Sequence, residues 1–170
     1  DKFIEECKKI NIEITDEILS KLIRYKDLLI KWNKKFNLTT IVLDEDIFLK
    51  HFYDSLCITK AIQFNNQKLC DFGTGAGFPG MVLAIVFSSG NFTLIESNNK
   101  KILFLEAVKV DLDLENVEIN GSPQTSTYSL ILEWELDSKI KWQDGGFEAF
   151  LLDNDSYLLI SEETLKNSIK

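Results

Sequence analysis

The chain has 170 residues, of which 45% are hydrophobic, and this is enough to bury one core but not two. Its net charge of −8 argues against a protein that simply coats nucleic acid, and its single histidine argues against a zinc site. No stretch reaches membrane-spanning length, no signal peptide is visible, and the three cysteines lack C-x-x-C spacing, so we expect one cytoplasmic domain with reduced core cysteines and no bound metal.

The first predicted helix begins at Thr15 or Asp16, because either residue can cap a helix N-terminus. Apolar residues then recur at helical spacing and predict a buried stripe of Ile18, Leu22, Tyr25, Leu29, Trp32 and Phe36. The same span sets a single acid, Asp27, against six cations, which are Lys21, Arg24, Lys26, Lys31, Lys34 and Lys35. Two interpretations of these cations remain open: a stripe that contacts nucleic acid, and a helix face whose lysines are only solvated.

A second helix is predicted from about Asp44. Its inward-facing residues are Phe48, Phe52 and Leu56. His51 lies among these apolar residues, where a lone histidine is either a packing residue or a catalyst. Asp54 and Ser55 follow it and either brace the helix or contribute to a site. Together these helices form an N-terminal helical part over residues 1–64.

A short buried strand at 69–72 runs into a glycine turn, Gly73-Thr74-Gly75-Ala76-Gly77, and then into a helix. Glycine accepts backbone angles that are closed to other residues, and it lets a ligand approach the main chain. The free N–H groups of the following helix then face that ligand. The turn lacks the Gly-Lys-Ser/Thr of an NTPase loop, but Gly75 to Gly80 fits the dinucleotide spacing G-x-G-x-x-G. The sequence therefore predicts a nucleotide-type pocket here.

Two acids narrow the choice of nucleotide. Asp71 ends the strand before the turn, and a carboxylate there repels a pyrophosphate but accepts hydrogen bonds from a cationic or polar ligand. Glu96 ends the next predicted strand about 20 residues on, where an acid can hold a ribose diol, although it can equally be a solvated strand end. The pair suits adenosyl-methionine better than NAD. An oxidoreductase that binds NAD remains the alternative.

From residue 69 the pattern alternates between strands and helices, in the order strand 69–72, helix 78–88, strand 92–96, helix 98–111 and strand 116–119. This is the βαβ rhythm of a parallel sheet with right-handed crossovers. Later segments at 147–152 and 157–160 predict an antiparallel hairpin at the sheet edge. The expected fold is α/β and Rossmann-like, with a parallel-rich sheet, helices on both faces and its cofactor-binding core over residues 65–170.

Four stretches are similar to consecutive segments of one family. Trp32–Thr39 (WNKKFNLT) resembles W-N-x-x-x-N-L-T, and Lys50–Leu56 (KHFYDSL) resembles [RK]-H-x-x-D-S-L. The glycine turn with Phe78-Pro79-Gly80 is similar to the family's cofactor loop, and Glu96–Leu105 is similar to its second-strand acid and following helix. Over roughly residues 15–120 the chain thus resembles the bacterial small-subunit (16S) ribosomal RNA guanine-N7 methyltransferases, also called glucose-inhibited division protein B.

The resemblance implies a monomeric methyltransferase that uses S-adenosyl-L-methionine and acts on N7 of a guanine in ribosomal RNA or the small ribosomal subunit. Guanine N7 carries a lone pair and no proton, so positioning rather than a general base carries the rate. The implied cofactor-binding residues are Asp71, Gly73, Gly75, Gly77, Phe78, Glu96, Pro123 and Gln124. The catalytic candidates are His51 and Asp54. The expected RNA-binding residues are Lys31, Lys34, Lys35 and Lys50.

Other readings stay open. Phe78, Trp32 and Phe36 also fit a purely core role. After about residue 120 the resemblance fades, and the family's active-site arginine has no counterpart there, because the only arginine of the chain is Arg24. A non-catalytic domain that keeps the nucleotide pocket as an RNA- or protein-binding module is therefore a further alternative.

Overall fold

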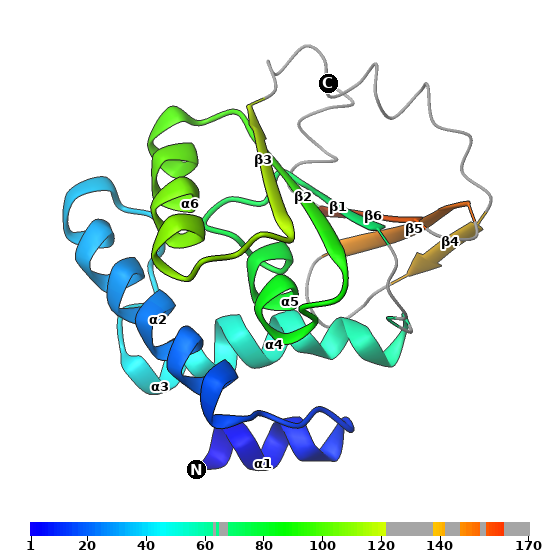
Figure 1. Ribbon diagram of the computed structural model, residues 1–170, viewed down its shortest axis with the longest axis horizontal. Coiled ribbons are helices and arrows are strands. Elements are labelled where there is room, and N and C mark those ends of the chain that lie inside the picture. Colours follow the sequence, from blue (N-terminus) through cyan, green and yellow to red (C-terminus); the bar gives the residue numbers. More distant parts are fainter. Residues whose placement is uncertain (63, 65–67, 122–137, 142–146, 154–155, 162–170) are drawn as a thin grey trace.

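A computed structural model describes residues 1–62, 64, 68–121, 138–141, 147–153 and 156–161. Its strands form a six-stranded sheet with the order β3-β2-β1-β6-β5-β4 (Figure 1). The strands are β1 Lys68–Phe72, β2 Asn91–Glu96, β3 Val117–Gly121, β4 Ser138–Lys141, β5 Phe147–Asp153 and β6 Ser156–Ser161. Helices alternate with the first three strands, which confirms the predicted α/β class.

The first three strands form the predicted parallel part of the sheet. β1 pairs in parallel with β2, which places Leu69 opposite Phe92, and β2 pairs in parallel with β3. Helix α5 (Gly80–Val86) connects β1 to β2, and helix α6 (Asn99–Asp111) connects β2 to β3. Both connections advance in the same direction across the sheet, so right-handed crossovers place both helices on one face. The expectation of helices on the other face is not tested by the described residues.

The late hairpin is confirmed, but its predicted place at the sheet edge is wrong. β5 and β6 pair antiparallel, with Phe147 opposite Ser161. β6 also pairs in parallel with β1 inside the sheet, and the strand at the edge is β4, which sequence reasoning missed. Leu158 and Leu159 are neighbours in β6, and both are fully buried. Because neighbouring strand residues point to opposite faces, β6 is covered on both, as interior strands are.

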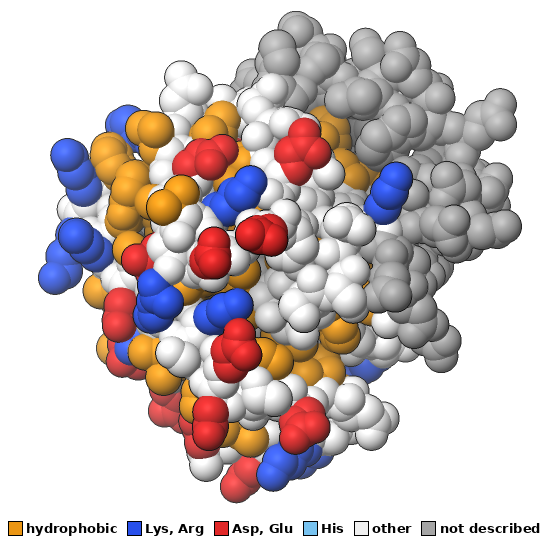
Figure 2. All heavy atoms as spheres, in the orientation of Figure 1, with side chains coloured by type: hydrophobic (Ala, Val, Ile, Leu, Met, Phe, Trp, Pro, Cys, Tyr) orange, Lys and Arg blue, Asp and Glu red, His pale blue; other side chains and the backbone are white. Residues whose placement is uncertain are grey.

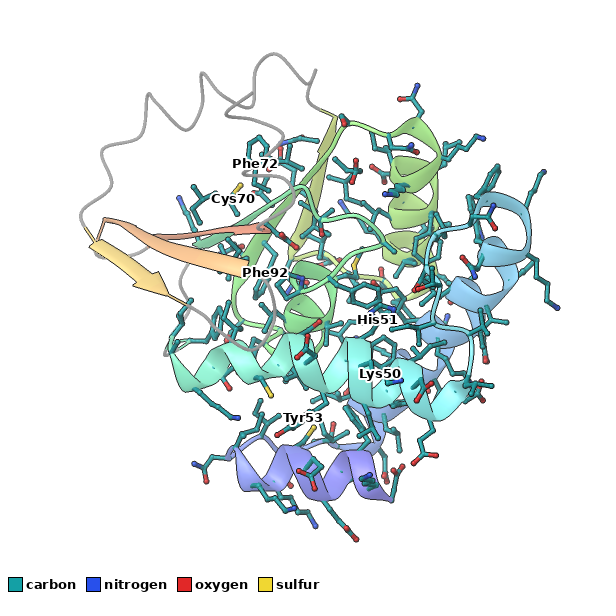
Figure 3. The ribbon with its side chains drawn as sticks, turned by 180° about the vertical axis from the view of Figure 1, so that it is seen from behind. Lys50, His51, Tyr53, Cys70, Phe72 and Phe92 are labelled. Atoms are coloured by element: carbon teal, nitrogen blue, oxygen red, sulfur yellow. The ribbon has the colours of Figure 1, made fainter. Side chains whose placement is uncertain are left out.

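The main core lies between the sheet and its helices. Figure 3 shows Phe92 on the helix side of the sheet and Cys70 and Phe72 on the opposite side. Leu69, Phe92 and Leu94 belong to the large hydrophobic cluster that α5 and α6 complete. Helix α2 (Asp16–Phe36) packs on both of these helices. The N-terminal helical part is therefore built onto the α/β part rather than set apart from it.

Helix α2 begins and ends where the sequence predicts. Thr15 caps it by accepting a hydrogen bond from the Ile18 N–H at 3.2 Å. Asn37 ends it in the left-handed conformation, with a φ of 51°. Beyond it the second predicted helix is irregular, because it consists of α3 Asp44–Asp46, the π-helix η1 Ile47–Tyr53, α4 Asp54–Leu56 and the 3₁₀-helix η2 Cys57–Lys60.

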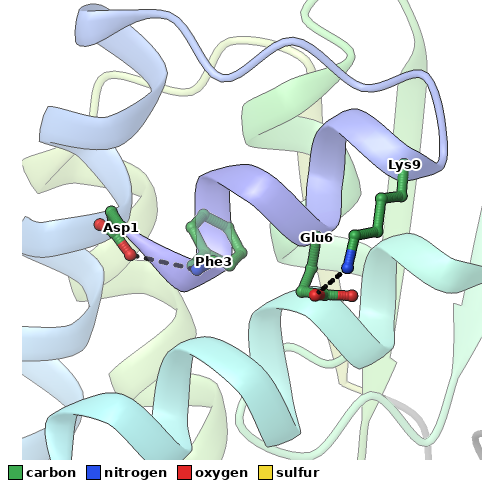
Figure 4. A network of polar contacts seen from close by, with 4 residues as sticks. All are labelled: Asp1, Phe3, Glu6 and Lys9. Carbon is green, nitrogen blue, oxygen red and sulfur yellow. Dashed lines mark hydrogen bonds and ion pairs between the residues drawn. The ribbon is translucent and has the colours of Figure 1, made fainter.

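The chain starts with a short helix, α1 (Lys2–Lys9), whose two ends are held by local contacts (Figure 4). The Asp1 carboxylate accepts a hydrogen bond from the Phe3 N–H at 3.1 Å. Lys9 and Glu6 form an ion pair at 2.6 Å. Within the described ranges, no helix is both long enough and apolar enough to cross a membrane.

The predicted core residues separate into two groups. Leu22, Tyr25 and Leu29 of the α2 stripe are fully buried. Trp32 and Phe36, nearer the end of α2, are only half-buried. None of the three cysteines forms a disulfide bond, and burial raises the pKa of the Cys7 and Cys70 thiols to about 12. These thiols therefore stay protonated at neutral pH.

Candidate functional site

The glycine turn follows β1 directly and is tied to the neighbouring strand. The N–H groups of Gly73 and Thr74 both donate to the Ile95 carbonyl, at 2.9 and 3.0 Å. All three glycines have positive φ, with values of 73° at Gly73, 63° at Gly75 and 104° at Gly77. Residues other than glycine rarely adopt these angles, so the turn requires the glycines that the sequence places there.

Gly75 and Gly77 differ in what surrounds them. A Cβ built on Gly77 would collide with the Tyr25 hydroxyl and would lie 2.8 Å from the Cβ of Met81. A Cβ on Gly75 would meet nothing within 4 Å. Gly77 is thus required for packing against α2, to which the Tyr25 hydroxyl adds a hydrogen bond donated to the Ala76 carbonyl. Of these two glycines, Gly75 is the one that faces open space.

Asp71 supports the turn from inside. Its carboxylate is 1% exposed, and Oδ2 accepts hydrogen bonds from the Thr74 hydroxyl at 2.7 Å and from the Gly80 N–H at 2.8 Å. Oδ1 is fully buried and has no hydrogen-bond partner in the described part of the chain. Burial raises the pKa of Asp71 to about 7, against the lowering effect of its hydrogen bonds. These contacts show that Asp71 supports the turn, and its expected role toward a ligand stays a prediction.

Glu96 holds the outer side of the turn. Its Oε1 accepts a hydrogen bond from the Gly75 N–H at 3.0 Å, and its Oε2 accepts one from the Asn98 N–H at 2.9 Å. The side chain is buried, so the reading of Glu96 as a solvated strand end is wrong. Each carboxylate oxygen has a second lone pair, which leaves Glu96 able to accept from a hydroxyl group as well.

His51 lies over the turn from the second helical segment, η1 (Figure 3). Its imidazole stacks flat on the Phe78 ring, with 4.2 Å between centroids and 1° between planes. Nε2 lies 2.8 Å from the Thr39 hydroxyl oxygen. Burial lowers the pKa of His51, so the ring is neutral at pH 7. Ser55 donates to the His51 carbonyl at 2.6 Å and so braces this segment, while Asp54 begins α4.

Phe78 connects the turn to the N-terminal helices. It is half-buried, and its second aromatic neighbour is Tyr25, at 5.7 Å between centroids. Further ring contacts lead from Tyr25 to Phe104, then to Trp32, and from Trp32 to Phe36. The three aromatic residues for which sequence alone left a core role open are thus linked within one cluster.

The basic stripe of α2 divides into two parts. Its first cations are paired with acids: Lys21 with Glu17, Arg24 with Asp111, and Lys26 with Asp27 and Asp44. Lys31, Lys34 and Lys35 are exposed and make no ion pair with any described residue. Basic side chains project from the left edge of the face in Figure 2, where α2 ends, whereas both signs of charge are mixed elsewhere on that face.

A lysine from another element joins this end of α2. The amino groups of Lys35 and Lys100 lie 5.4 and 5.6 Å from the centroid of the Phe36 ring, within the range of cation–π contacts. Lys50, also expected to bind RNA, instead pairs with Asp46 at 3.3 Å. Lys100 was not predicted to belong to this surface, because its proximity to Phe36 depends on how α6 packs against α2.

Other residues of the site were also missed from sequence. Asn33 accepts a hydrogen bond from the Thr39 N–H at 2.8 Å, which fixes the loop that brings Thr39 to His51. Sequence alone offered Asn37 and Thr39 as residues that end the helix, and of these Asn37 ends α2 whereas Thr39 contacts His51. Pro123 and Gln124, which were predicted to bind the cofactor, lie outside the described residues. No metal-binding cluster of three or more His, Cys, Asp or Glu side chains occurs among the described residues.

Comparison with known proteins supports one family. Residues 18–123 match the family model described as rRNA small subunit methyltransferase G. The curated relatives named "Ribosomal RNA small subunit methyltransferase G" include that of Mesoplasma florum, 50% identical over 61% of this chain and 44% of its own. The Mycoplasma mycoides relative is 50% identical over 64% of this chain and 80% of its own. The Alkaliphilus oremlandii relative is 45% identical over 67% and 48%.

The chain spans about half the length of most of these relatives, and the match ends before the late strands. Among solved structures, a SAM-dependent methyltransferase from Aquifex aeolicus aligns with 48% of this chain and 44% of its own at 23% identity, with a TM-score of 0.40, a likeness too slight to inform the site. The sequence match covers α2, η1, the glycine turn and α6, which are the elements that build the candidate site. The chain belongs to the rRNA small subunit methyltransferase G family.

Proposed function

We propose that this chain binds S-adenosyl-L-methionine at the glycine turn and transfers its methyl group to N7 of a guanine in small-subunit ribosomal RNA. The observation that carries this proposal is the outer side of the turn, where Gly75 faces open space beside the Glu96 carboxylate. The names of the relatives, which are ribosomal RNA small subunit methyltransferases, support the reaction and the class of substrate.

The residues of the turn have different proposed roles in cofactor binding. Gly75 and Gly73 offer backbone groups, and Glu96 accepts hydrogen bonds from the ribose hydroxyls with its remaining lone pairs. Asp71 and Gly77 act indirectly, because they hold the turn on α5 and α2. Phe78 contributes an apolar surface, and Pro123 and Gln124 complete the proposed cofactor set on the basis of the family resemblance. When bound, the cofactor supplies an electrophilic methyl group.

The chemistry demands little of the protein beyond positioning. Guanine N7 presents a lone pair, so His51 does not need to remove a proton. A neutral imidazole suits contact with the base better than a charged one, and burial lowers the pKa of His51. His51 is therefore proposed to contact the base. Asp54 follows η1 directly and stays a second candidate on the basis of that position.

The RNA is proposed to reach the site over the end of α2. Lys31, Lys34 and Lys35 have no acidic partner among the described residues and can meet phosphates, while Phe36 offers a ring on which an unpaired base can stack. Lys100 lies in the first turn of α6 and extends this surface toward Glu96, from which only residues 97–99 separate it in the sequence. Lys50 already pairs with Asp46, so it is assigned a smaller part in RNA binding.

A binding module without catalysis is the second candidate, and one observation favours it. Arg24, the only arginine of the chain, pairs with Asp111 on α6 and does not lie at the turn. If the reaction requires an arginine at the site, this chain binds cofactor and RNA without transferring the methyl group.

Two measurements separate these functions. Ligand binding to the folded state raises the melting temperature, so adenosyl-homocysteine should stabilise the protein and NAD should not. Stabilisation by NAD alone would favour the oxidoreductase. Labelled adenosyl-methionine with small subunits from cells that lack the modification should then label RNA that becomes cleavable by aniline after reduction, as N7-methylguanosine does. Cofactor binding without any labelling would favour the binding module.

A further inference from the structure

Three contacts connect the loop after α2 to the glycine turn. The Thr39 N–H donates to the Asn33 side chain, the Thr39 hydroxyl contacts Nε2 of His51, and the His51 ring lies flat on Phe78. Thr39 joins the end of α2 to η1, and His51 of η1 joins both to the glycine turn. The Thr39 hydroxyl therefore makes a contact with His51 that a residue serving only to end α2 would not need.

The hydrogen-bond pattern of Thr39 favours one of the two neutral forms of His51. The Thr39 oxygen accepts a hydrogen bond from the Ile41 N–H at 3.1 Å, which leaves its own proton free to be donated. Nε2 of His51, 2.8 Å from the Thr39 oxygen, is an acceptor within reach of this proton. When Nε2 accepts it, the neutral ring carries its own proton on Nδ1.

Nδ1, the other nitrogen of His51, makes no hydrogen bond to any described residue. The residue is half-buried rather than buried. A donor at this place, above the ring of Phe78, is available to a ligand.

We propose that Thr39 is a positioning residue, which fixes His51 in the Nδ1–H tautomer so that this N–H donates to an acceptor on the substrate base. The acceptor next to N7 in guanine is O6, whereas adenine presents an amino group at the same place. A neutral Nδ1–H thus selects guanine and leaves the N7 lone pair untouched. This inference rests on the proposed function for its substrate, but the assignment of the proton stands independently.

The tautomer can be measured directly, because His51 is the only histidine of the chain. In ¹⁵N-labelled protein without a histidine tag, two-bond ¹⁵N–¹H correlations should show the proton on Nδ1. Thr39→Val removes the hydroxyl at nearly constant volume and should shift the population toward the Nε2–H form that histidine prefers in water. Thr39→Ser retains a hydroxyl and should retain the Nδ1–H form. Thr40→Val, at the exposed neighbouring residue, is the matched control and should change nothing.

Activity supplies the second readout. Thr39→Val should lower kcat/KM for guanine-containing RNA about tenfold, as expected for loss of one hydrogen bond to the substrate. Thr39→Ser should restore it, and the Kd for adenosyl-homocysteine should stay the same in both variants. A mainly Nε2–H tautomer in the wild type, or a tautomer unchanged by Thr39→Val, would overturn the inference. If the wild type transfers no methyl group, the proposed function fails, and the tautomer spectra still decide the role of Thr39.

Discussion

The two sides of the glycine turn use the same residue types for different purposes. On the inner side, Asp71 and Gly77 face α5 and Tyr25, and no space is left for a ligand. On the outer side, Gly75 faces open space, and the buried Glu96 carboxylate accepts hydrogen bonds from N–H groups of the turn region with both of its oxygens. A glycine or an acid in a nucleotide-binding motif therefore cannot be assigned to the ligand from the motif alone. Asp71 and Gly77 maintain the shape of the turn, and Glu96 and Gly75 are the residues that this shape offers to a ligand.

The largest effect should come from the inner glycine. Gly77→Ala places a Cβ against Tyr25 and Met81 at a φ of 104°, and it should lower the free energy of unfolding by about 2–4 kcal/mol. Gly75→Ala is the matched control, because its Cβ meets nothing within 4 Å and only the backbone angle costs about 1 kcal/mol. Urea unfolding of both variants measures the difference. Equal losses would mean that the inner and outer sides do not differ.

The outer acid should affect the ligand more than the fold. Glu96→Ala removes a charge-assisted acceptor and should weaken adenosyl-homocysteine binding by about 1.5–3 kcal/mol. Isothermal titration calorimetry measures this change, with the exposed Glu118 of β3 replaced by Ala as the control. Unchanged affinity in Glu96→Ala would limit this residue to a role within the turn.

The inner acid should make stability depend on pH. The folded-state pKa of Asp71, about 7, lies above its ordinary value of 3.8, so between these values the folded state binds more protons than the unfolded state. Its contribution to stability is therefore fully present below about pH 4 and is lost as pH rises toward 7, by at most about 1.4 kcal/mol per pH unit. Asp71→Asn should remove this slope in urea unfolding series. A slope that persists in the variant would have to come from other groups.

The smallest effect is expected at the end of α2, outside the turn. Replacing Lys31, Lys34 and Lys35 together by glutamine should reduce the slope of log affinity for single-stranded RNA against log salt by about 2. Cofactor affinity should not change, because neither side of the turn contacts these lysines. Replacing Lys21 and Lys26, which already pair with acids, provides the control. Filter binding over a range of salt concentrations would show whether the two sets differ.

Local patterns predicted the local structure well. The cap at Thr15, the apolar stripe through Tyr25 and the βαβ alternation all depend on spacing within one element, which a sequence displays directly. The interior place of β6, the pairing of Lys50 with Asp46 and the inner role of Gly77 depend on contacts between elements. The two adjacent leucines of β6 were a signal for an interior strand, and the polar Asn33 and Thr39 flanking the end of α2 were a signal for a built loop. Neither pattern identifies the residues that the segment contacts, so the fold was needed to find them.

The contacts of Glu96 also bear on the thermodynamics of ligand capture. Its two oxygens already restrain the backbone at Gly75 and Asn98 before any ligand arrives. A ligand that enters this turn therefore has little loop to order, and less of its interaction energy is lost to conformational entropy. Association should be fast and should need no preceding rearrangement of the turn. Affinity among related ligands would then be set mainly by how slowly each one leaves.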